Sequence, residues 1–268
     1  MSAFQNKVVV ITGGSDGIGK ALVDQFLSLG AKVATCGRNY DKLYQLQTQH
    51  SSRPLLIYTA DVSNELDCKN FIDQVIKTYG TVDVLINNAG VSMRALVKDL
   101  AIDTLRKVFD INFWGTVYCT KFALPYIIKN QGTVVGVTSI AGYRGLPGRS
   151  GYSASKHAVN GWLEALRTEL LDTGVNVMWV APGFTTSNIR NAALNAKGES
   201  QGESPMDEKA MMTAEACATH IITAIEKRKR TLVLTAQGLQ TVWLNKLLPS
   251  FADKLVHKFF FKNGELVK

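Results

Sequence analysis

The chain alternates short apolar runs with stretches in which apolar residues recur at helical spacing. The apolar runs are rich in β-branched residues and have the length of buried strands. They cover residues 7–12, 32–36, 55–60, 82–87, 133–138, 175–180 and 231–235. Between the first two runs, helical spacing connects Ile18, Leu22, Phe26 and Leu29 up to Gly30, and it also fills residues 102–129, 152–172 and 213–227.

This alternation predicts the fold class. A strand, a helix and a second parallel strand form a right-handed crossover, and repeated crossovers build a parallel sheet covered by helices on both faces. We therefore expect an α/β protein with a doubly wound Rossmann fold and a parallel sheet of about seven strands. No internal repeat or linker interrupts the pattern, so residues 1–268 are predicted to form a single domain.

Two segments depart from the alternation. Residues 188–207 are polar and contain Gly and Ser, and because compact domains rarely keep idle loops of this length, we expect a substrate lid there. Residues 239–268 combine aromatic and aliphatic side chains with lysines and contain Pro249. Such a basic amphipathic extension can pack on the core or a subunit neighbour, cover the substrate pocket, or lie on an anionic membrane surface.

Composition narrows the classes of function. A hydrophobic fraction of 46% with 19% charged residues is typical of a globular enzyme and excludes a disordered chain. The formal net charge is +8, but the one compact basic run, residues 227–230, closes a predicted helix, where cations suit the helix dipole. We therefore expect no nucleic-acid partner, and an anionic cofactor accounts for part of the charge.

The cysteines and the apolar runs bear on metals and location. Cys36, Cys68, Cys119 and Cys217 are widely spaced, without a CxxC or Cys/His metal pattern, so we expect reduced thiols and no metal. The first residues do not resemble a signal peptide, and no apolar run reaches the ~18 residues of a membrane span. A cytoplasmic protein is expected, with peripheral membrane contact through residues 239–268 as an open alternative.

A glycine-rich segment follows the first predicted strand. Its sequence, TGGSDGIG at residues 12–19, allows a tight turn that brings backbone N–H groups and a helix N-terminus close to a pyrophosphate. The predicted phosphate-binding residues are Gly13, Ser15, Asp16, Gly17, Ile18 and Gly19. Asp16 must then point away from the phosphates, because a carboxylate beside them would cost free energy.

The end of the second predicted strand indicates which cofactor binds. An acidic residue there would accept from the ribose 2′-hydroxyl of NAD. Here Arg38 follows the strand and no carboxylate occurs before Asp41. A guanidinium can pair with a 2′-phosphate through its planar fork of donors. The sequence therefore favours NADP(H), with NAD(H) as the alternative.

Tyr152 and Lys156 lie one turn apart on one face of a predicted helix. A free tyrosine has a pKa of about 10 and is a poor acid–base catalyst at neutral pH. A neighbouring ammonium, together with the cationic oxidised nicotinamide, favours the phenolate and lowers that pKa. Ser139, at the end of the fifth predicted strand, can donate a hydrogen bond to a reacting oxygen. The pattern indicates proton transfer coupled to hydride transfer.

With these residues identified, the chain resembles the short-chain dehydrogenase/reductase family, in its classical size group. The matching motifs are TGGSDGIG at 12–19, DV at 61–62, NNAG at 87–90, Asn112, TSIAG at 138–142, YSASK at 152–156 and PG at 182–183. They occur in the family's order and span most of the first 190 residues. The resemblance implies an oxidoreductase that interconverts carbonyl and alcohol groups, and it also implies homodimers or homotetramers.

The resemblance further implies roles for individual residues. Catalysis would use Asn112, Ser139, Tyr152 and Lys156, with Tyr152 as the general acid in reduction, Lys156 on the nicotinamide ribose and Asn112 holding a water of the proton relay. The adenosine would contact Asp61, Val62, Asn88, Ala89 and Gly90. The nicotinamide would contact Pro182, Gly183, Thr185 and Ser187, the last standing where the family commonly has Thr. Gly136 is a departure that concerns packing.

The substrate wall is expected from the loops after the fourth, fifth and sixth predicted strands. Its candidate residues are Ser92, Met93, Arg94, Leu146 and Phe184. Most of them are apolar, and the C-terminal segment loosely resembles those of keto-sphingoid and steroid reductases, so we expect NADP(H)-dependent reduction of a lipophilic ketone or aldehyde. An NAD-dependent alcohol or polyol dehydrogenase is the second hypothesis. A catalytically idle nucleotide-binding or membrane-associated scaffold is the third.

Overall fold

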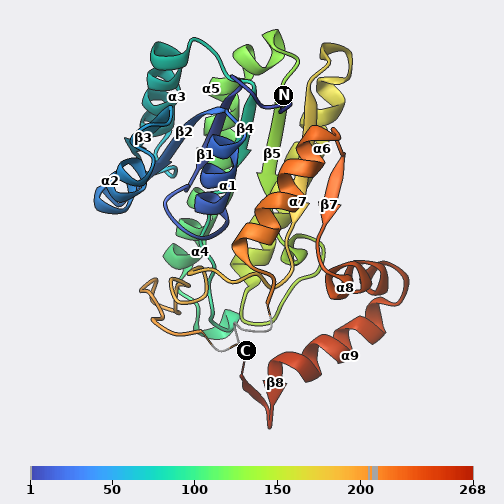
Figure 1. Cartoon of the computed structure of the whole chain (residues 1–268). Coiled ribbons are helices and arrows are strands. Elements are labelled where there is room, and N and C mark those ends of the chain that lie inside the picture. Colours follow the sequence, from blue (N-terminus) through green and yellow to red (C-terminus); the bar gives the residue numbers. More distant parts are fainter. Residues whose placement is uncertain (1, 205, 207–210, 268) are drawn as a thin grey trace.

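The computed structural model describes residues 2–204, 206 and 211–267. Its centre is one parallel sheet in the order β3-β2-β1-β4-β5-β6-β7 (Figure 1). The strands are β1 (Val8–Thr12), β2 (Lys32–Gly37), β3 (Leu55–Thr59), β4 (Val84–Asn87), β5 (Thr133–Val137), β6 (Asn176–Ala181) and β7 (Thr231–Val233). The predicted doubly wound fold is confirmed, with all seven expected strands in it.

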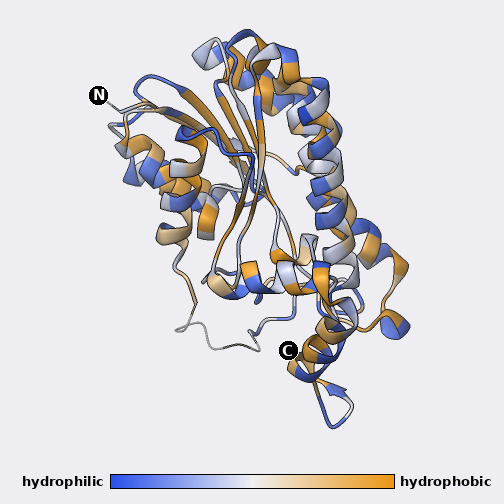
Figure 2. Ribbon diagram, turned by 90° about the vertical axis from the view of Figure 1, so that its right-hand side faces the viewer, coloured by the Kyte–Doolittle hydropathy of each residue, from blue (hydrophilic) through white to orange (hydrophobic). Residues whose placement is uncertain are grey.

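Helices cover both faces of the sheet. They are α1 (Gly17–Ser28), α2 (Tyr40–Gln49), α3 (Glu65–Tyr79), α4 (Ile102–Phe109), α5 (Gly115–Lys129), α6 (Ser150–Glu169) and α7 (Ala214–Glu226). Val9 of β1 packs in the core with α1 and α7, whereas Val10 packs with α3, α5 and α6 on the other face. Since both faces are buried, the strands are apolar throughout, while the helices carry polar and apolar residues (Figure 2).

The chain from α4 to α5 departs from the single helix predicted over residues 102–129. A π-helical turn, η2 (Asp110–Trp114), separates the two α-helices. The turn contains Asn112, whose side chain is fully buried. A π-helical turn inserts one residue and re-aims the side chains that follow, and such turns often occur at functional sites.

The glycine within β5 is explained by the packing of α6. A Cβ atom built on Gly136 would collide with the Leu163 side chain of α6. The glycine therefore lets the helix approach the strand closely. This close approach brings the first turns of α6 to the carboxyl end of β5, where Thr138 and Ser139 follow.

The segment after β7 forms two further helices and a hairpin. These are α8 (Ala236–Leu247), α9 (Pro249–Phe260) and the strands β8 (Phe261–Lys262) and β9 (Glu265–Leu266). Pro249 begins α9, where the missing N–H costs nothing, so it does not interrupt a helix. We call α8, α9 and the β8–β9 hairpin the C-terminal arm, and it lies beside the loops at the carboxyl end of the sheet (Figure 1).

The order of the strands locates the site. The chain runs from β1 outward to β3 and then returns to β4 on the other side of β1. Ligands of doubly wound sheets bind at this switch point, outside the carboxyl ends of the strands. Within the described part of the chain, no helix has the length and apolar character needed to cross a membrane.

Candidate active site

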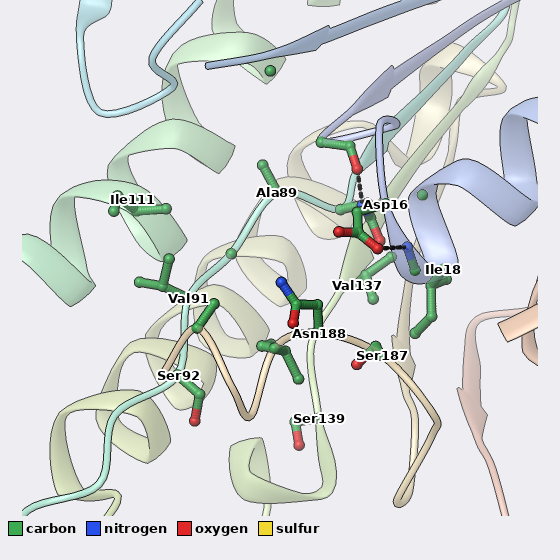
Figure 3. Close-up of a pocket in the computed structure, with 18 of the residues that line it drawn as sticks. Asp16, Ile18, Ala89, Val91, Ser92, Ile111, Val137, Ser139, Ser187 and Asn188 are labelled. Carbon is green, nitrogen blue, oxygen red and sulfur yellow. Dashed lines mark hydrogen bonds between the residues drawn. The ribbon is translucent and has the colours of Figure 1, made fainter. Parts of the chain in front are cut away.

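A cavity of about 480 Å³ opens at the carboxyl ends of the strands. In Figure 3, Asp16, Ile18 and Ala89 lie at one end of it, Ser92 and Ser139 at the other, and Asn188 between them. The wall includes every residue that the sequence predicted for cofactor binding, namely Gly13, Ser15, Asp16, Gly17, Ile18, Gly19, Arg38, Asp61, Val62, Asn88, Ala89, Gly90, Tyr152, Lys156, Pro182, Gly183, Thr185 and Ser187.

The glycine-rich turn ends at the N-terminus of α1. Gly13 has φ +69°, a conformation that suits glycine. Asp16 caps the helix, because its Oδ1 accepts from the Gly17 N–H at 2.8 Å, and its Oδ2 pairs with Lys42 Nζ at 2.7 Å. The carboxylate is thus neutralised by a helix cap and a lysine. The positive end of the α1 dipole lies beside the cavity and can hold a phosphate.

The segment after β4 braces this turn. Asn88 Nδ2 donates to the carbonyl oxygens of Thr12 and Gly13, at 3.0 and 3.1 Å. Thr12 Oγ1 in turn accepts from the backbone N–H groups of Asn88 and Ala89. A Cβ on Gly19 would collide with the Gly13 carbonyl and the Asn88 amide. The side chain of Asn88 therefore holds the loop, while Ala89 and Gly90 line the cavity.

Cations and one carboxylate surround the other end of the predicted cofactor site. Arg38, exposed at the rim after β2, lines the cavity together with Lys42. Asp61 also lines it, and its Oδ1 accepts from the backbone N–H and the hydroxyl of Ser63, at 3.0 and 2.7 Å. A glycine-lined helix N-terminus followed by two cations provides the donors that the phosphates of a dinucleotide require.

The structure brings three of the four predicted catalytic residues onto one wall. Tyr152 and Lys156 are buried in the first turns of α6, and Lys156 Nζ lies 5.7 Å from the centre of the Tyr152 ring. The same Nζ donates to the Val137 carbonyl at the end of β5 at 2.9 Å. Ser139 forms a hydrogen bond with Tyr152, and its Oγ accepts from the Ala141 N–H at 3.2 Å.

Burial controls the charge states of this pair. It lowers the pKa of Lys156 to about 8 and raises the pKa of Tyr152 above its usual value. The hydrogen bond from Ser139 and the positive charges of Arg149 and Arg190 oppose the rise in the Tyr152 pKa. The sequence attributed a lowered Tyr152 pKa to Lys156 and the oxidised nicotinamide together; among the chain's own groups, desolvation outweighs the cations that lower this pKa. Tyr152 is therefore a protonated phenol at neutral pH, as a general acid must be.

Asn112 lies behind the cavity wall. Its Oδ1 accepts from the Val91 N–H at 2.8 Å, and its Nδ2 donates to the Val91 carbonyl at 3.0 Å and to Ser155 Oγ at 2.9 Å. The Ser155 hydroxyl donates to the Tyr152 carbonyl at 2.8 Å. The π-helical turn thus ties the loop after β4 to the catalytic turn of α6.

Three of the five predicted substrate residues, Ser92, Leu146 and Phe184, line the cavity. Met93 does not, because it is fully buried in a cluster with Tyr152 and Leu194. Arg94 does not either, since its Nη2 lies 3.5 Å from the Leu266 carbonyl of the C-terminal arm. Side chains alternate along this extended segment, which explains why Met93 points away while Ser92 faces the cavity, whereas Arg94 is drawn to the C-terminal arm.

Several lining residues were missed from the sequence. They include Lys42, Val91, Ile111 and Arg149. Arg149 directly precedes α6, outside the predicted helix, and no motif marks it. The predicted lid contributes Asn188, Ile189, Arg190 and Ala192 to the wall, and Arg190 Nη2 donates to the Thr185 carbonyl at 2.9 Å. Lid residues 205 and 207 lie outside the described residues.

Cys36 lines the cavity, but its thiol is protonated. The four cysteines are free and buried, and burial raises the pKa values of Cys36 and Cys217 to about 12. Protonated thiols of this kind are unreactive. Among the described residues, no three His, Cys, Asp or Glu side chains gather in a group that could hold a metal ion.

Comparisons with known proteins agree with this geometry. The sequence profile of the short chain dehydrogenase family matches residues 7–198. "Dehydrogenase/reductase SDR family member 7B" of Mus musculus is 34% identical over 239 residues, which is 87% of this chain and 74% of that protein. "Dehydrogenase/reductase SDR family protein 7-like" of Dictyostelium discoideum is 31% identical and covers 96% of this chain and 83% of its own length.

Solved structures share the fold. A short chain dehydrogenase/reductase from Burkholderia phymatum in complex with NAD superposes with a TM-score of 0.84 at 23% identity, covering 94% of this chain and 96% of that one. An alcohol dehydrogenase from Thermococcus sibiricus complexed with 5-hydroxy-NADP gives a TM-score of 0.76 at 23% identity, covering 86% and 96% of the two chains. At this identity, the likeness concerns the fold alone.

Proposed function

Because this chain belongs to the short chain dehydrogenase family and is an NAD(P)-binding oxidoreductase, we propose that it uses NADP(H) to reduce a lipophilic ketone or aldehyde. The observation that carries this proposal is the buried Tyr152 phenol, which lies with Ser139 and Lys156 in the same cavity as the glycine-rich turn.

The bound cofactor would supply hydride to the carbonyl carbon, and the chain's own residues would handle the oxygen. Ser139 can donate a hydrogen bond to that oxygen as negative charge develops on it. Tyr152 can then give it the phenolic proton. Lys156, fixed by the Val137 carbonyl, places a positive charge beside the resulting phenolate. Asn112 and Ser155 hold the turn that carries Tyr152.

The preference for NADP(H) rests on the cations at the cavity rim. Arg38 and Lys42 both line it, and Lys42 reaches Asp16 of the glycine-rich turn. Replacing Arg38 with alanine should weaken NADPH binding by about 10- to 100-fold and leave NADH binding nearly unchanged, because only NADPH has the 2′-phosphate. Titration of both cofactors by fluorescence tests this. A wild-type preference for NADH would support the alternative, an NAD-dependent alcohol or polyol dehydrogenase.

The proposal of a lipophilic substrate rests on the apolar residues of the cavity wall. Val91, Leu146, Phe184 and Ile189 line the substrate end, and Phe259 of the C-terminal arm stacks on Phe184 with ring centres 6.3 Å apart. NADPH oxidation should be measured against lipid ketones, steroids, short aldehydes and sugars. Turnover should be greatest with the long apolar compounds, and a preference for sugars would refute this specificity.

The substitution Tyr152→Phe separates an enzyme from an idle scaffold. It removes the acidic hydroxyl and keeps the ring, so kcat should fall by at least about 100-fold while the Kd for NADPH stays the same. A scaffold shows no turnover even in the wild type. Retained turnover in the variant would exclude Tyr152 as the acid.

The exposed apolar residues suggest two kinds of contact. The C-terminal arm exposes Trp243, Leu247 and Phe251 next to lysines, which supports peripheral contact with an anionic membrane surface. Trp114 and Ile128, near α5, also expose apolar surface, which supports a homodimer or homotetramer assembled through this side.

A further inference from the structure

One cation at the substrate end has no carboxylate partner in the described part of the chain. Arg149 directly precedes α6, is 8% exposed and lines the cavity. Its Nη1 is buried without a hydrogen-bond acceptor, and no described carboxylate forms an ion pair with it. Because burying an unpaired charge is unfavourable, such a residue points to a ligand of opposite charge.

Neighbouring arginines increase the positive potential at this place. Burial, followed by repulsion from Arg94 and Arg190, lowers the pKa of Arg149 to about 10, so it remains a cation at neutral pH. Arg94 Nε is likewise buried without a hydrogen-bond partner among the described residues. Arg190 lies on the same cavity wall and donates to the Thr185 carbonyl. Two guanidinium groups, those of Arg149 and Arg190, thus line this end of the cavity, and the charge of Arg94 acts on Arg149 from outside the cavity wall.

The C-terminal arm fixes the Arg149 side chain. Its guanidinium carbon lies 5.3 Å from the centre of the buried Phe260 ring. Stacking over an aromatic face orients the guanidinium plane and leaves its N–H edge available for bonds in that plane. A planar fork of donors held in this way matches the oxygens of a carboxylate or phosphate.

We propose that Arg149 binds an anionic group of the substrate, a carboxylate or a phosphate, and that the substrate is therefore an acidic amphiphile with a reducible carbonyl. This inference rests on the proposed reductase function and specifies its substrate class. Arg149 directly precedes the helix that carries Tyr152, both residues line the cavity, and the charge of Arg149 acts on the Tyr152 hydroxyl. The anionic group should therefore lie near the carbonyl carbon in the substrate.

Matched substrates test the inference on the wild-type protein. One pair is a long-chain 4-oxo fatty acid and its methyl ester, and the other is a long-chain 1-hydroxy-2-ketone and its phosphate monoester. With NADPH, the anionic member of at least one pair should have a kcat/KM about 10- to 100-fold higher than the neutral member. The pair with the larger ratio distinguishes a carboxylate from a phosphate.

The variant Arg149→Met should reduce that ratio to near one by raising KM for the anionic substrate. Arg149→Lys keeps the charge without the fork and should restore part of the ratio. Arg144→Met is the matched control, because Arg144 pairs with Asp253 of the C-terminal arm but does not line the cavity. It should leave the ratio as in the wild type.

The outcomes separate this inference from other roles of Arg149. If Arg149 acts only by lowering the pKa of Tyr152, the variant loses activity equally on both members of a pair. If Arg149 only anchors the C-terminal arm, Arg144→Met should cause the same loss of preference for the anionic substrate as Arg149→Met. Either result, or a wild type that prefers the neutral members, overturns the inference while the reductase function stands. A wild type that reduces none of these carbonyls, nor any in the wider panel, refutes the proposed function itself.

Discussion

Burial determines whether Tyr152 acts as an acid or as a base at neutral pH. Because its pKa is raised, the phenol stays protonated through the neutral range and can donate. We expect kcat/KM for carbonyl reduction to be constant near neutral pH and to fall at higher pH as the proton is lost. Alcohol oxidation needs the phenolate and should rise with pH over the same range. Rates measured in both directions from pH 6 to about 11 check this, because the raised pKa places the change above the usual value of about 10.

The outcome that contradicts this pH dependence is a reduction rate that rises with pH, which would mean that a different group donates the proton. Arg149→Met offers a second check, because the positive charge of Arg149 opposes the rise in the Tyr152 pKa. Its removal should shift the oxidation profile to higher pH. Arg144→Met should leave the profile unchanged, since Arg144 is not among the charges that act on Tyr152.

Residue positions could be predicted from the sequence where a motif fixed them. The glycine-rich turn and the Tyr152–Lys156 pair lie where their motifs place them, on the wall of one cavity. Met93 and Arg94 could not be oriented, because no motif indicates which side chain of an extended loop faces inward. The environment of Arg149 could not be predicted either, because Phe260, whose ring lies against the Arg149 guanidinium, is distant in the sequence.

The junction of β1 and α1 depends on two loops approaching closely. In Gly19→Ala, the new Cβ would press on the Gly13 carbonyl and the Asn88 amide, so the loop must shift. We expect NADPH affinity to fall by at least about 10-fold, since the α1 N-terminus would no longer be aligned with the phosphates. Fluorescence titration measures this loss.

The matched control is Gly161→Ala in α6, where a Cβ would meet no atom within 4 Å. Alanine is the better helix former by about 1 kcal/mol, so this variant should bind NADPH normally and unfold at a slightly higher temperature. If Gly19→Ala also binds normally, the close approach of the two loops is not needed for the cofactor.

The boundaries of elements were predictable where hydrophobic periodicity was regular. Each predicted strand has its counterpart in the sheet, because a strand buried on both faces is an unbroken apolar run. The π-helical turn at Asp110–Trp114 was not predictable, since a single inserted residue barely disturbs the apolar period of a long helix. Its position follows instead from the hydrogen bonds of Asn112 with Val91.

The whole molecule joins a doubly wound core to a C-terminal arm that contacts the substrate end. Phe259 stacks on Phe184, Phe260 lies against Arg149, and Leu266 touches Gly148. These contacts use one side of the arm. The side left exposed carries Leu247 at 65% and Phe251 at 52% exposure, together with Trp243. The arm can therefore contact the active site and an external surface at the same time.

We expect the exposed side of the arm to bind anionic membranes. The protein should co-sediment with vesicles of phosphatidylcholine and phosphatidylserine and much less with phosphatidylcholine alone, because the lysines of the arm are attracted to negative lipids. The double variant Leu247→Asp/Phe251→Asp should reduce the bound fraction by about 10-fold or more, since it removes apolar contact and adds negative charge.

Leu66→Asp is the control, because Leu66 is also exposed but lies on α3, away from the arm. It should bind vesicles like the wild type. Analytical ultracentrifugation of the same variants separates membrane contact from self-association. If the double variant is a smaller oligomer than the wild type and the wild type binds no vesicles, this side of the arm is a subunit interface. If the double variant binds vesicles as well as the wild type does, membrane contact occurs elsewhere. The two introduced aspartates would otherwise be buried at the lipid surface, at a large desolvation cost.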